Sequence, residues 1–304
     1  MYKEGIVVRS TGSWHTVHTS DNETTECKIK GRFRIEGLRT TNPIAVGDHV
    51  TFKITPSGEG IITGILERKN YIIRKATKLS KATHIIASNL DQAIMIVSLI
   101  KPRTSTGFID RFLTTAEAYH IPAAIVFNKY DLYDDSLKEQ LEYYAKVYNE
   151  LGYITLLTSV PEKKNLKAFK KLLMDKVSLL SGHSGVGKSA LINTIDPSLN
   201  LKEGAISEYH KKGKHTTTFA EMFALSFGGY IIDTPGIKEF GLVEFEKEEL
   251  GQRFPEMRAH MHDCRFNNCL HVDEPGCEVL NALNEGKIAE FRYINYLNML
   301  ENLM

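Results

Sequence analysis

The sequence contains no apolar segment long enough to cross a membrane as a helix. Its 304 residues include no run of 18 consecutive apolar residues, and the longest apolar segment, residues 93–100, is interrupted by Ser98. The first residues also lack the apolar core of a signal peptide. We therefore expect a cytoplasmic protein that has no membrane partner.

Strong charge of either sign is also absent. The chain carries 38 Lys and Arg residues against 37 Asp and Glu, a formal net charge of +1, so its overall charge does not indicate a nucleic-acid-binding protein. The distribution is uneven, because residues 1–75 hold 12 basic and 8 acidic residues whereas residues 241–304 hold 6 and 12. The two ends are expected to contact different surfaces, although ordinary solvated faces would give the same counts.

Cysteine is scarce, and three of the four cysteines lie within residues 264–277. Such clustering in a chain without a signal peptide favours a metal site over disulfides. Three thiolates and one imidazole suit a single tetrahedral Zn²⁺ in a closed structural site. The predicted ligands are Cys264, Cys269, His271 and Cys277. His260 and His262 are the alternative ligands, and Cys27 is expected to be a packed thiol.

Short β-rich segments dominate the first 70 residues, and turn residues such as Gly12 and Gly47 separate them. These segments are residues 6–8, 14–17, 27–30, 49–54 and 61–66. About five short strands in so short a stretch predict a small closed β-barrel. We predict an OB-fold, and an SH3-like barrel would give much the same pattern.

From about residue 71 the pattern changes to strands that alternate with helices. Strands are expected at residues 93–99, 123–127, 154–157 and 177–180, with helices near residues 109–119, 135–151 and 165–176 between them. Residues 222–225 and 230–233 are expected to form a hairpin in the same sheet. This alternation predicts an α/β domain with a doubly wound parallel sheet and helices on both faces.

A phosphate-binding P-loop is the most specific motif in the chain. It fits G-x-x-x-x-G-K-[ST], follows a predicted strand and precedes a predicted helix at residues 188–195. Its glycines let backbone N–H groups approach the phosphates, Lys188 neutralises the β- and γ-phosphates during catalysis, and the Ser189 hydroxyl joins the Mg²⁺ shell. The predicted nucleotide-binding residues here are Gly182, His183, Ser184, Gly185, Val186, Gly187, Lys188, Ser189 and Ala190.

A guanine-reading motif, N-K-x-D, precedes the P-loop and consists of Asn128, Lys129 and Asp131 around one variable residue. The Asp131 carboxylate would accept hydrogen bonds from N1–H and the 2-amino group of guanine, which adenine lacks, and so select GTP over ATP. Lys129 is expected to lie along the base and tie this loop to the P-loop. Ser159 is expected where a backbone amide meets guanine O6, although Val160 departs from the usual pattern and a plain strand end is the alternative.

Two further segments are predicted to sense the γ-phosphate. Asp233 ends a strand and is expected to hold Mg²⁺, and the amide of Gly236 follows it in the motif D-T-P-G. One threonine between the P-loop and Asp233 is expected to close over Mg²⁺ and GTP. The candidates are Thr216, Thr217 and Thr218. His215 is the candidate for positioning the attacking water, and contact with RNA by a basic loop is the alternative.

The order of these motifs along the chain is unusual. An ordinary GTPase has its P-loop first and its guanine-reading loop later, whereas here residues 128–131 precede residues 182–189. A circular permutation of this kind leaves all the loops at the same sheet edge, so the site survives. We predict three domains: an RNA-binding barrel at residues 1–70, a permuted GTPase at residues 71–240 and a helical zinc-binding domain at residues 241–304.

The combination of a small barrel, a permuted GTPase and a C-terminal Cys/His cluster resembles the RsgA (YjeQ) family of small-ribosomal-subunit biogenesis GTPases. The likeness covers essentially the whole chain and includes residues 128–131, 182–189, 213–218 and 233–237. It implies hydrolysis of GTP to GDP with Mg²⁺, in late maturation of the small ribosomal subunit. It also implies binding to that subunit and its rRNA, and stimulation by the subunit. Nothing in the sequence suggests more than a monomer.

One residue bears on the rate of hydrolysis. Ile237 occupies the position after Gly236 where many GTPases carry a glutamine that orients water, so intrinsic hydrolysis is expected to be slow. Two other functions are compatible with the P-loop: a nucleotide-gated signalling module with a protein partner, and a phosphotransfer enzyme such as a nucleotide kinase. The guanine-reading loop weighs against the kinase. Because Gly236 now lies directly before the C-terminal domain, we also hypothesise that γ-phosphate sensing moves that domain.

Overall fold

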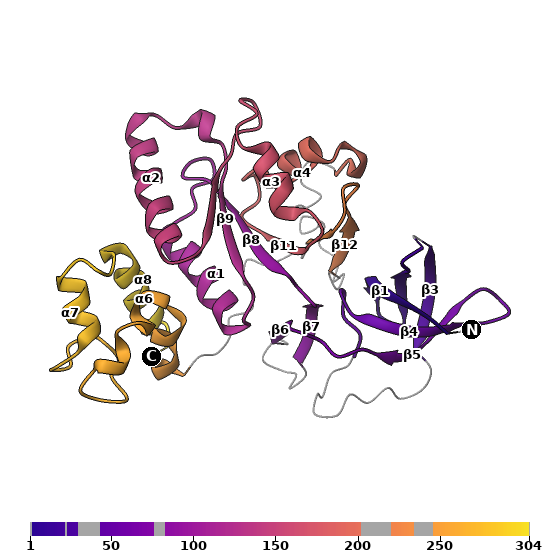
Figure 1. The fold of residues 1–304 in the computed structure, drawn as a ribbon, viewed down its shortest axis with the longest axis horizontal. Coiled ribbons are helices and arrows are strands. Elements are labelled where there is room, and N and C mark those ends of the chain that lie inside the picture. Colours follow the sequence, from indigo (N-terminus) through magenta and orange to yellow (C-terminus); the bar gives the residue numbers. More distant parts are fainter. Residues whose placement is uncertain are drawn as a thin grey trace.

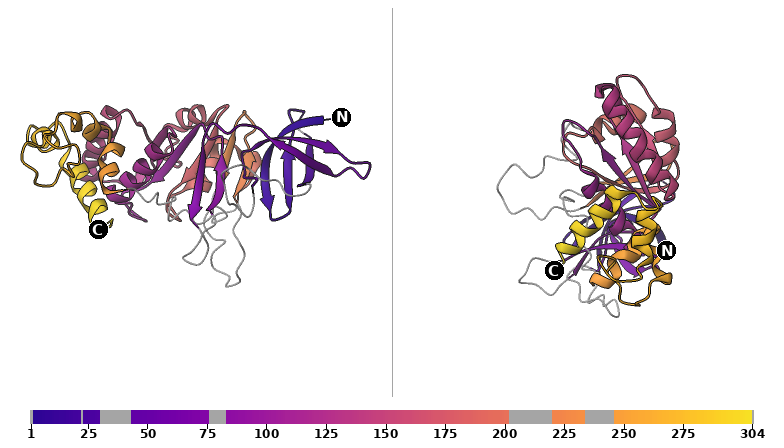
Figure 2. Two further views of the ribbon diagram at one scale, coloured as in Figure 1. Left: turned by 90° about the horizontal axis from the view of Figure 1, so that it is seen from below. Right: turned by 90° about the vertical axis from the view of Figure 1, so that its left-hand side faces the viewer.

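The computed structural model describes residues 2–21, 23–29, 43–75, 83–201, 220–233 and 246–303. A β-barrel lies at one end, a sheet covered by helices lies in the middle, and a group of helices lies at the other end (Figures 1 and 2). The two ends of the chain lie in these outer regions, far from each other. The predicted multi-domain fold is confirmed. No helix in the described part of the chain is long and apolar enough to span a membrane.

The N-terminal barrel has five strands in the order β1-β2-β3-β5-β4, and β4 pairs back onto β1 to close it. The strands are β1 (Tyr2–Thr11), β2 (Trp14–His18), β3 (Thr24–Ile29), β4 (His49–Ile54) and β5 (Gly60–Ile65). All neighbours are antiparallel except β3 and β5, which run parallel. Val17, Cys27, Phe52 and Ile62 fill the interior. The predicted OB-fold-like barrel is confirmed.

Side chains of β1 serve two cores, because successive residues of a strand point to opposite faces. Val7 packs inside the barrel. Ile6 and Val8 point outward and belong to the same buried cluster as Met95 and Phe127 of the central sheet. Strand β1 therefore contributes one face to the core of the barrel and the other face to the core of the central sheet.

A buried carboxylate strengthens this junction. Asp48 is completely buried and accepts hydrogen bonds from Nε of Arg68 at 2.6 Å, Oγ of Ser88 at 2.6 Å and the backbone N–H of Ala45 at 2.8 Å. Ser88 ends the hairpin of β6 (Tyr71–Lys75) and β7 (Thr83–Ser88), a two-stranded sheet that lies between the barrel and the central sheet. We did not predict this hairpin.

His15 of β2 is completely buried inside the barrel. Neither of its ring nitrogens has a hydrogen-bond partner among the described residues. Burial lowers the pKa of His15, because a buried imidazolium loses its hydration, and the charges of Asp48 and Glu26 oppose this shift only in part. The folded barrel therefore favours a neutral histidine.

The barrel is expected to lose stability as the pH falls below about 6.5, the ordinary pKa of histidine. In that range the unfolded chain binds a proton that folded His15 does not, so each pH unit, down to the lowered folded pKa, costs up to about 1.4 kcal/mol. Urea unfolding followed by the fluorescence of Trp14, the single tryptophan, reports on this region. His15→Leu should flatten the pH profile, and His49→Gln at an exposed site should leave it unchanged. A wild-type stability that stays constant from about pH 7.5 to about pH 5 would contradict this assignment.

The central sheet has the strand order β10-β9-β8-β11-β13-β12. Its strands are β8 (Gln92–Val97), β9 (Ala123–Phe127), β10 (Ile154–Leu157), β11 (Val177–Ser181), β12 (Glu221–Ala224) and β13 (Tyr230–Asp233). The first five strands in this order run parallel, and the edge strand β12 is antiparallel to β13. The predicted strands and the hairpin are confirmed.

Helices cover both faces of this sheet, as predicted. Helices α1 (Thr106–Ala118) and α2 (Asp135–Glu150) pack on one face, and α3 (Leu166–Leu173) and α4 (Lys188–Ile195) pack on the other. All six residues of β8 are buried, because Met95 and Val97 face the first pair of helices and Ile94 and Ile96 face the second. The helix expected to reach residue 176 ends at Leu173, because Asp175 adopts a left-handed conformation (φ 56°) and turns the chain into β11.

The C-terminal region is helical and has its own core. Its α-helices are α5 (Lys247–Leu250), α6 (Pro255–Arg258), α7 (Glu278–Asn284) and α8 (Glu290–Glu301). Phe254, Met257 and Tyr296 pack with Cys269 and Cys277 in a cluster separate from the other cores.

A buried ion-pair cluster joins α8 to α1. Arg292 is 1% exposed, and its guanidinium donates hydrogen bonds to the carboxylates of Asp110 on α1 and Glu256 on α6. Tyr148 and Asn295 also donate to Asp110, at 2.7 and 2.6 Å. Although burial alone would lower it, Asp110 and Glu256 raise the pKa of Arg292 well above its ordinary value.

Candidate nucleotide and metal sites

The P-loop connects the end of β11 to the start of α4, and two of its glycines are required by the backbone. Gly182 has φ 138°, and a Cβ there would lie 2.1 Å from the carbonyl oxygen of Ile96. Gly187 has φ 98°, and its Cβ would lie 2.4 Å from Nδ2 of Asn128. No larger side chain fits either position, so these residues hold the loop against β8 and against the guanine-reading loop.

The P-loop lysine points back along its own loop. Nζ of Lys188 donates to the carbonyl oxygens of Gly182 at 2.7 Å and His183 at 2.9 Å. Lys188 and Ser189 form the first turn of α4, and both are buried. The ammonium group is therefore held at the loop whose N–H groups and helix terminus are suited to phosphate.

Asn128 joins three loops through its buried amide. Its Nδ2 donates to the carbonyl oxygen of Val186 in the P-loop at 2.8 Å, and its Oδ1 accepts from Oγ1 of Thr158 at 3.0 Å. Lys129 adds a second link, because its Nζ donates to the carbonyl oxygen of Gly185 at 2.6 Å. The predicted phosphate loop, guanine-reading loop and O6 loop therefore lie together at one edge of the sheet.

The carboxylate of Asp131 is oriented by the neighbouring loop. Oγ of Ser159 donates to Oδ1 of Asp131 at 2.6 Å and accepts from the backbone N–H of Glu162 at 3.1 Å. The backbone N–H of Tyr130 donates to the carbonyl oxygen of Thr158 at 3.1 Å. These bonds leave Asp131 half-buried and fix its direction, as a base-reading carboxylate requires.

The predicted γ-phosphate sensors lie mostly outside the described residues. Asp233 is the last residue of β13, and its backbone is in register with Leu180 of β11, immediately before the P-loop. Its backbone thus lies beside the strand that leads into the P-loop, while its side chain is not described. His215, Thr216, Thr217, Thr218 and Gly236 lie outside the described residues.

Two contacts in this site were not predicted from the sequence. His183 of the P-loop stacks on Phe108 of α1, with ring centroids 4.3 Å apart and an interplanar angle of 26°. The hydroxyl of Tyr133 donates to the carbonyl oxygen of Asn128 at 2.7 Å and so stabilises the guanine-reading loop. Neither contact could be recognised from a local pattern, because Phe108 lies in a helix outside any motif and Tyr133 follows the guanine-reading motif without being part of it.

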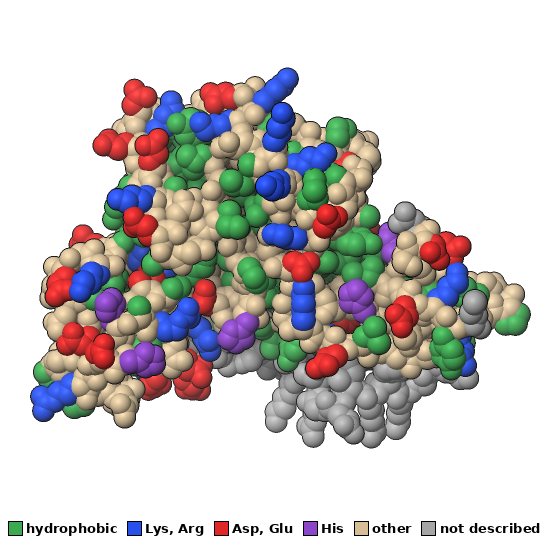
Figure 3. Space-filling model, in the orientation of Figure 1, with side chains coloured by type: hydrophobic (Ala, Val, Ile, Leu, Met, Phe, Trp, Pro, Cys, Tyr) green, Lys and Arg blue, Asp and Glu red, His purple; other side chains and the backbone are tan. Residues whose placement is uncertain are grey.

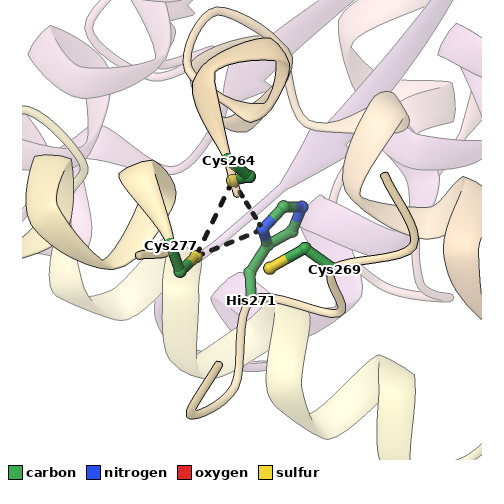
Figure 4. Close-up of side chains that lie close together, drawn as sticks. All are labelled: Cys264, Cys269, His271 and Cys277. Atoms are coloured by element: carbon green, nitrogen blue, oxygen red, sulfur yellow. Dashed lines mark hydrogen bonds between the residues drawn. The ribbon is translucent and has the colours of Figure 1, made fainter. Parts of the chain in front are cut away.

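A second candidate site lies in the C-terminal region, where three cysteines and one histidine face a common centre (Figure 4). Their ligand atoms all lie within 4.8 Å of one another. Those atoms belong to Cys264, Cys269, His271 and Cys277. Sγ of Cys264 lies 4.0 Å from Sγ of Cys277, and Nδ1 of His271 lies 3.4 Å from Sγ of Cys277. Ligands at about 2.3 Å around a tetrahedral Zn²⁺ would be about 3.8 Å apart, so the donor set fits this metal. His260 and His262 are not members of the cluster.

The chemistry around this cluster also suits a cation. Burial raises the pKa of the Cys269 thiol to about 12 and raises that of Cys277, so both thiolates need a positive charge. The loop is attached to α8 by Tyr293, whose hydroxyl donates to the carbonyl oxygen of His271 at 2.7 Å. Glu274 accepts hydrogen bonds from the backbone N–H groups of Leu270 and Val272 and shapes the turn.

The comparisons with known proteins agree along the chain. The family model described as RsgA GTPase matches residues 65–243, and the model described as RsgA N-terminal domain matches residues 4–62. A curated relative from Christiangramia forsetii, named small ribosomal subunit biogenesis GTPase RsgA, is 50% identical over 301 residues. That match covers 98% of this chain and 96% of the relative.

Two solved structures are similar over the full chain. YjeQ from Thermotoga maritima is 36% identical, with a TM-score of 0.82, and the match covers 100% of this chain and 99% of that one. YloQ, described as a circularly permuted GTPase, is 28% identical, with a TM-score of 0.77, over 100% of this chain and 95% of the other. The reversed order of the two nucleotide loops is thus the arrangement of a known permuted GTPase.

Proposed function

Because this chain belongs to the RsgA family of GTPases, we propose that it hydrolyses GTP in a late step of small-ribosomal-subunit maturation. The relative from Christiangramia forsetii is named a small ribosomal subunit biogenesis GTPase. The subunit is proposed to be both the partner and the activator of hydrolysis. A slow intrinsic rate follows from Ile237, since an aliphatic side chain cannot orient the attacking water.

One observation carries the nucleotide part of this proposal. Asn128 and Lys129 hydrogen-bond directly to the carbonyl oxygens of Val186 and Gly185, so the guanine-reading loop and the P-loop form a single unit. A site built in this way binds base and phosphates together, and distinguishes GTP from other triphosphates by the base.

We assign the site residues as follows. Backbone N–H groups of the P-loop and the Lys188 ammonium would hold the phosphates, and Asp131 would hold guanine. Ser189 and Asp233 would hold Mg²⁺, which neutralises charge on the β- and γ-phosphates when it is bound. Lys188 would exchange its hydrogen bonds to the carbonyl oxygens of Gly182 and His183 for hydrogen bonds to phosphate oxygens. Its ammonium group is therefore already positioned in the loop before the nucleotide binds.

We further propose that the Cys/His cluster of the C-terminal region holds one structural Zn²⁺. The four donors form a closed set, which leaves no position for a substrate. The metal would therefore stabilise the fold and take no part in hydrolysis.

The barrel is proposed to contact rRNA. Lys28 lies over the ring of Trp14, with Nζ 3.9 Å from the ring centroid, and Lys53 lies over Tyr2 at 4.2 Å. Tyr2 is 64% exposed. Flat rings beside ammonium groups suit unpaired bases and their phosphates.

GTP turnover by the purified protein is expected to rise about tenfold or more when purified small ribosomal subunits are added. The reason is that the subunit would supply the group that orients the attacking water, which the chain itself lacks. Large ribosomal subunits serve as the control. Equal turnover with and without small subunits would refute the ribosomal role and favour a GTP-gated module with a protein partner.

The same assay ties activity to the assigned site. Asp131→Asn should abolish GTP turnover and confer turnover of xanthosine triphosphate, because asparagine can donate to the 2-oxo group of xanthine while still accepting from N1–H. Turnover of GTP that is unaffected by Asp131→Asn would mean that base reading lies elsewhere.

A further inference from the structure

A run of lysines lies on the surface of the GTPase region, outside the barrel. It consists of Lys163, Lys164, Lys167, Lys170 and Lys171, on α3 and the turn before it, and is called here the α3 lysine face. Lys163, Lys167 and Lys171 are exposed, and the other two are half-buried. Basic side chains gather over α3 in the space-filling view (Figure 3).

None of these lysines forms an ion pair with a carboxylate in the described part of the chain. On α2, in contrast, Lys138 pairs with Asp135 at 3.9 Å and Lys146 pairs with Glu150 at 3.8 Å. The half-buried members of the face rest on aromatic rings instead. Lys164 lies 4.0 Å from the ring centroid of Tyr130, and Lys170 lies 4.4 Å from that of Phe227.

This arrangement is electrostatically unfavourable in the free protein. Lys167 repels Lys170 and Lys171 at helical spacings i,i+3 and i,i+4. The first turn of α3 contains no acidic residue, and Lys163 and Lys164 lie just before it, where the helix dipole disfavours cations. Only Lys170 and Lys171, in the last turn, gain from the dipole. The face therefore has charge that an external anion would neutralise.

The backbone beneath the face is firmly held. Phe169, Leu172 and Leu173 of α3 are buried in the core. Nδ2 of Asn165 donates to the carbonyl oxygen of Leu157 at 2.8 Å, and the backbone N–H of Lys164 donates to the carbonyl oxygen of Ser159 at 2.9 Å. The ammonium groups thus extend from a fixed base, which lowers the entropy lost on binding.

We propose that the α3 lysine face is an RNA-binding surface on the GTPase region itself, separate from the barrel, and that it takes the phosphodiester backbone of small-subunit rRNA. The identity of the RNA rests on the proposed function. Phosphate is the chemistry that fits, because lysine acts on it as a point charge without demanding a geometry. A protein partner fits less well, since lysine is depleted from protein interfaces and this face lacks an exposed aromatic anchor.

The test compares two triple variants that lose the same charge. Lys163→Gln, Lys167→Gln and Lys171→Gln together remove the exposed members of the face. Lys138→Gln, Lys146→Gln and Lys287→Gln remove three surface lysines that have carboxylate partners. Binding to naked small-subunit rRNA and to small ribosomal subunits is measured over a range of KCl concentrations, with melting temperature and basal GTP turnover as checks on the fold.

The face variant is expected to bind naked rRNA and subunits about tenfold or more weakly and to lower the salt-dependence slope by about 2 to 3, because each lost phosphate contact removes about 0.9. The control triple should do neither, and basal turnover should stay unchanged in both. An equal loss in the two triples, or a loss on subunits but not on naked rRNA, would overturn the proposal. The two proposals can also fail separately. If rRNA binding is lost only in the face variant but subunits do not stimulate the wild-type protein, the α3 lysine face is supported and the proposed function is refuted.

Discussion

Arg292→Leu is expected to lower the free energy of opening the α1–α8 interface by about 3–5 kcal/mol. The substitution leaves the carboxylates of Asp110 and Glu256 buried without a cation, and both are less than a tenth exposed. Removal of one partner from a buried pair costs far more than the pair contributes, because the remaining charge has lost both water and its counterion. Hydrogen exchange of the α8 amides measures this opening directly, in a chain whose regions need not unfold together.

The chain offers a matched control for this experiment. Arg258 of α6 pairs with Glu117 of α1 at 3.0 Å across the same interface, but its side chain is 45% exposed. Arg258→Leu should cost only about 0–1 kcal/mol. Combining Arg292→Leu with Asp110→Asn and Glu256→Gln should recover part of the loss, since no buried charge remains. Equal costs for Arg292→Leu and Arg258→Leu would show that burial does not set the strength of this connection.

Removal of metal from the Cys/His cluster is expected to unfold residues 246–303 while the GTPase region stays folded. The proposed ligands Cys269 and Cys277 are part of the apolar core of the C-terminal region. Without a cation these buried thiols cannot ionise, and the loop that carries them loses the metal–ligand bonds that would hold it together. Structural zinc contributes on the order of 10 kcal/mol or more in small domains, so the region has no comparable replacement.

The measurement is metal content together with hydrogen exchange before and after chelation. Cys277→Ser should reproduce the effect of the chelator. Cys27→Ser, in the barrel core, should leave metal content unchanged, because Cys27 does not belong to the metal cluster found among the described residues. GTP binding should survive chelation, because no residue of the P-loop belongs to this core. Purified protein without zinc, or a C-terminal region that keeps its protection after chelation, would contradict the metal assignment.

The contiguous motifs could be predicted from the sequence because each packs its chemistry into a few neighbouring residues. The P-loop and the guanine-reading loop need fixed residue types at fixed spacings, and the strands before them are short, apolar and easily recognised. The metal cluster is equally local, with its four members inside residues 264–277. For these elements the sequence pattern was sufficient.

Long-range contacts could not be predicted in the same way. Arg292 and Asp110 lie 182 positions apart, and neither belongs to a motif. The stack of His183 on Phe108 depends on how α1 packs beside the P-loop. The end of α3 was predicted too late, because nothing in the residue types at 174–176 announces the left-handed turn at Asp175. Tertiary packing decided each of these features.

The hypothesis that γ-phosphate sensing moves the C-terminal region is supported by a physical connection that runs through α1. Phe108 of this helix contacts the P-loop through His183, and Asp110, two residues later, holds Arg292 of α8. Helix α1 therefore connects the C-terminal region to the P-loop. Any movement of that region must either carry α1 along or break the buried ion pairs.

The packing of β1 against the core of the central sheet has a consequence for how the chain can be divided. The family models meet between residues 62 and 65, yet Ile6 and Val8 are buried in the same cluster as Phe127. A fragment that begins after the barrel would expose the part of that cluster which Ile6 and Val8 cover. The boundary between the two family models is therefore a boundary in sequence and not in packing, and we expect the barrel and the central sheet to be inherited as a pair.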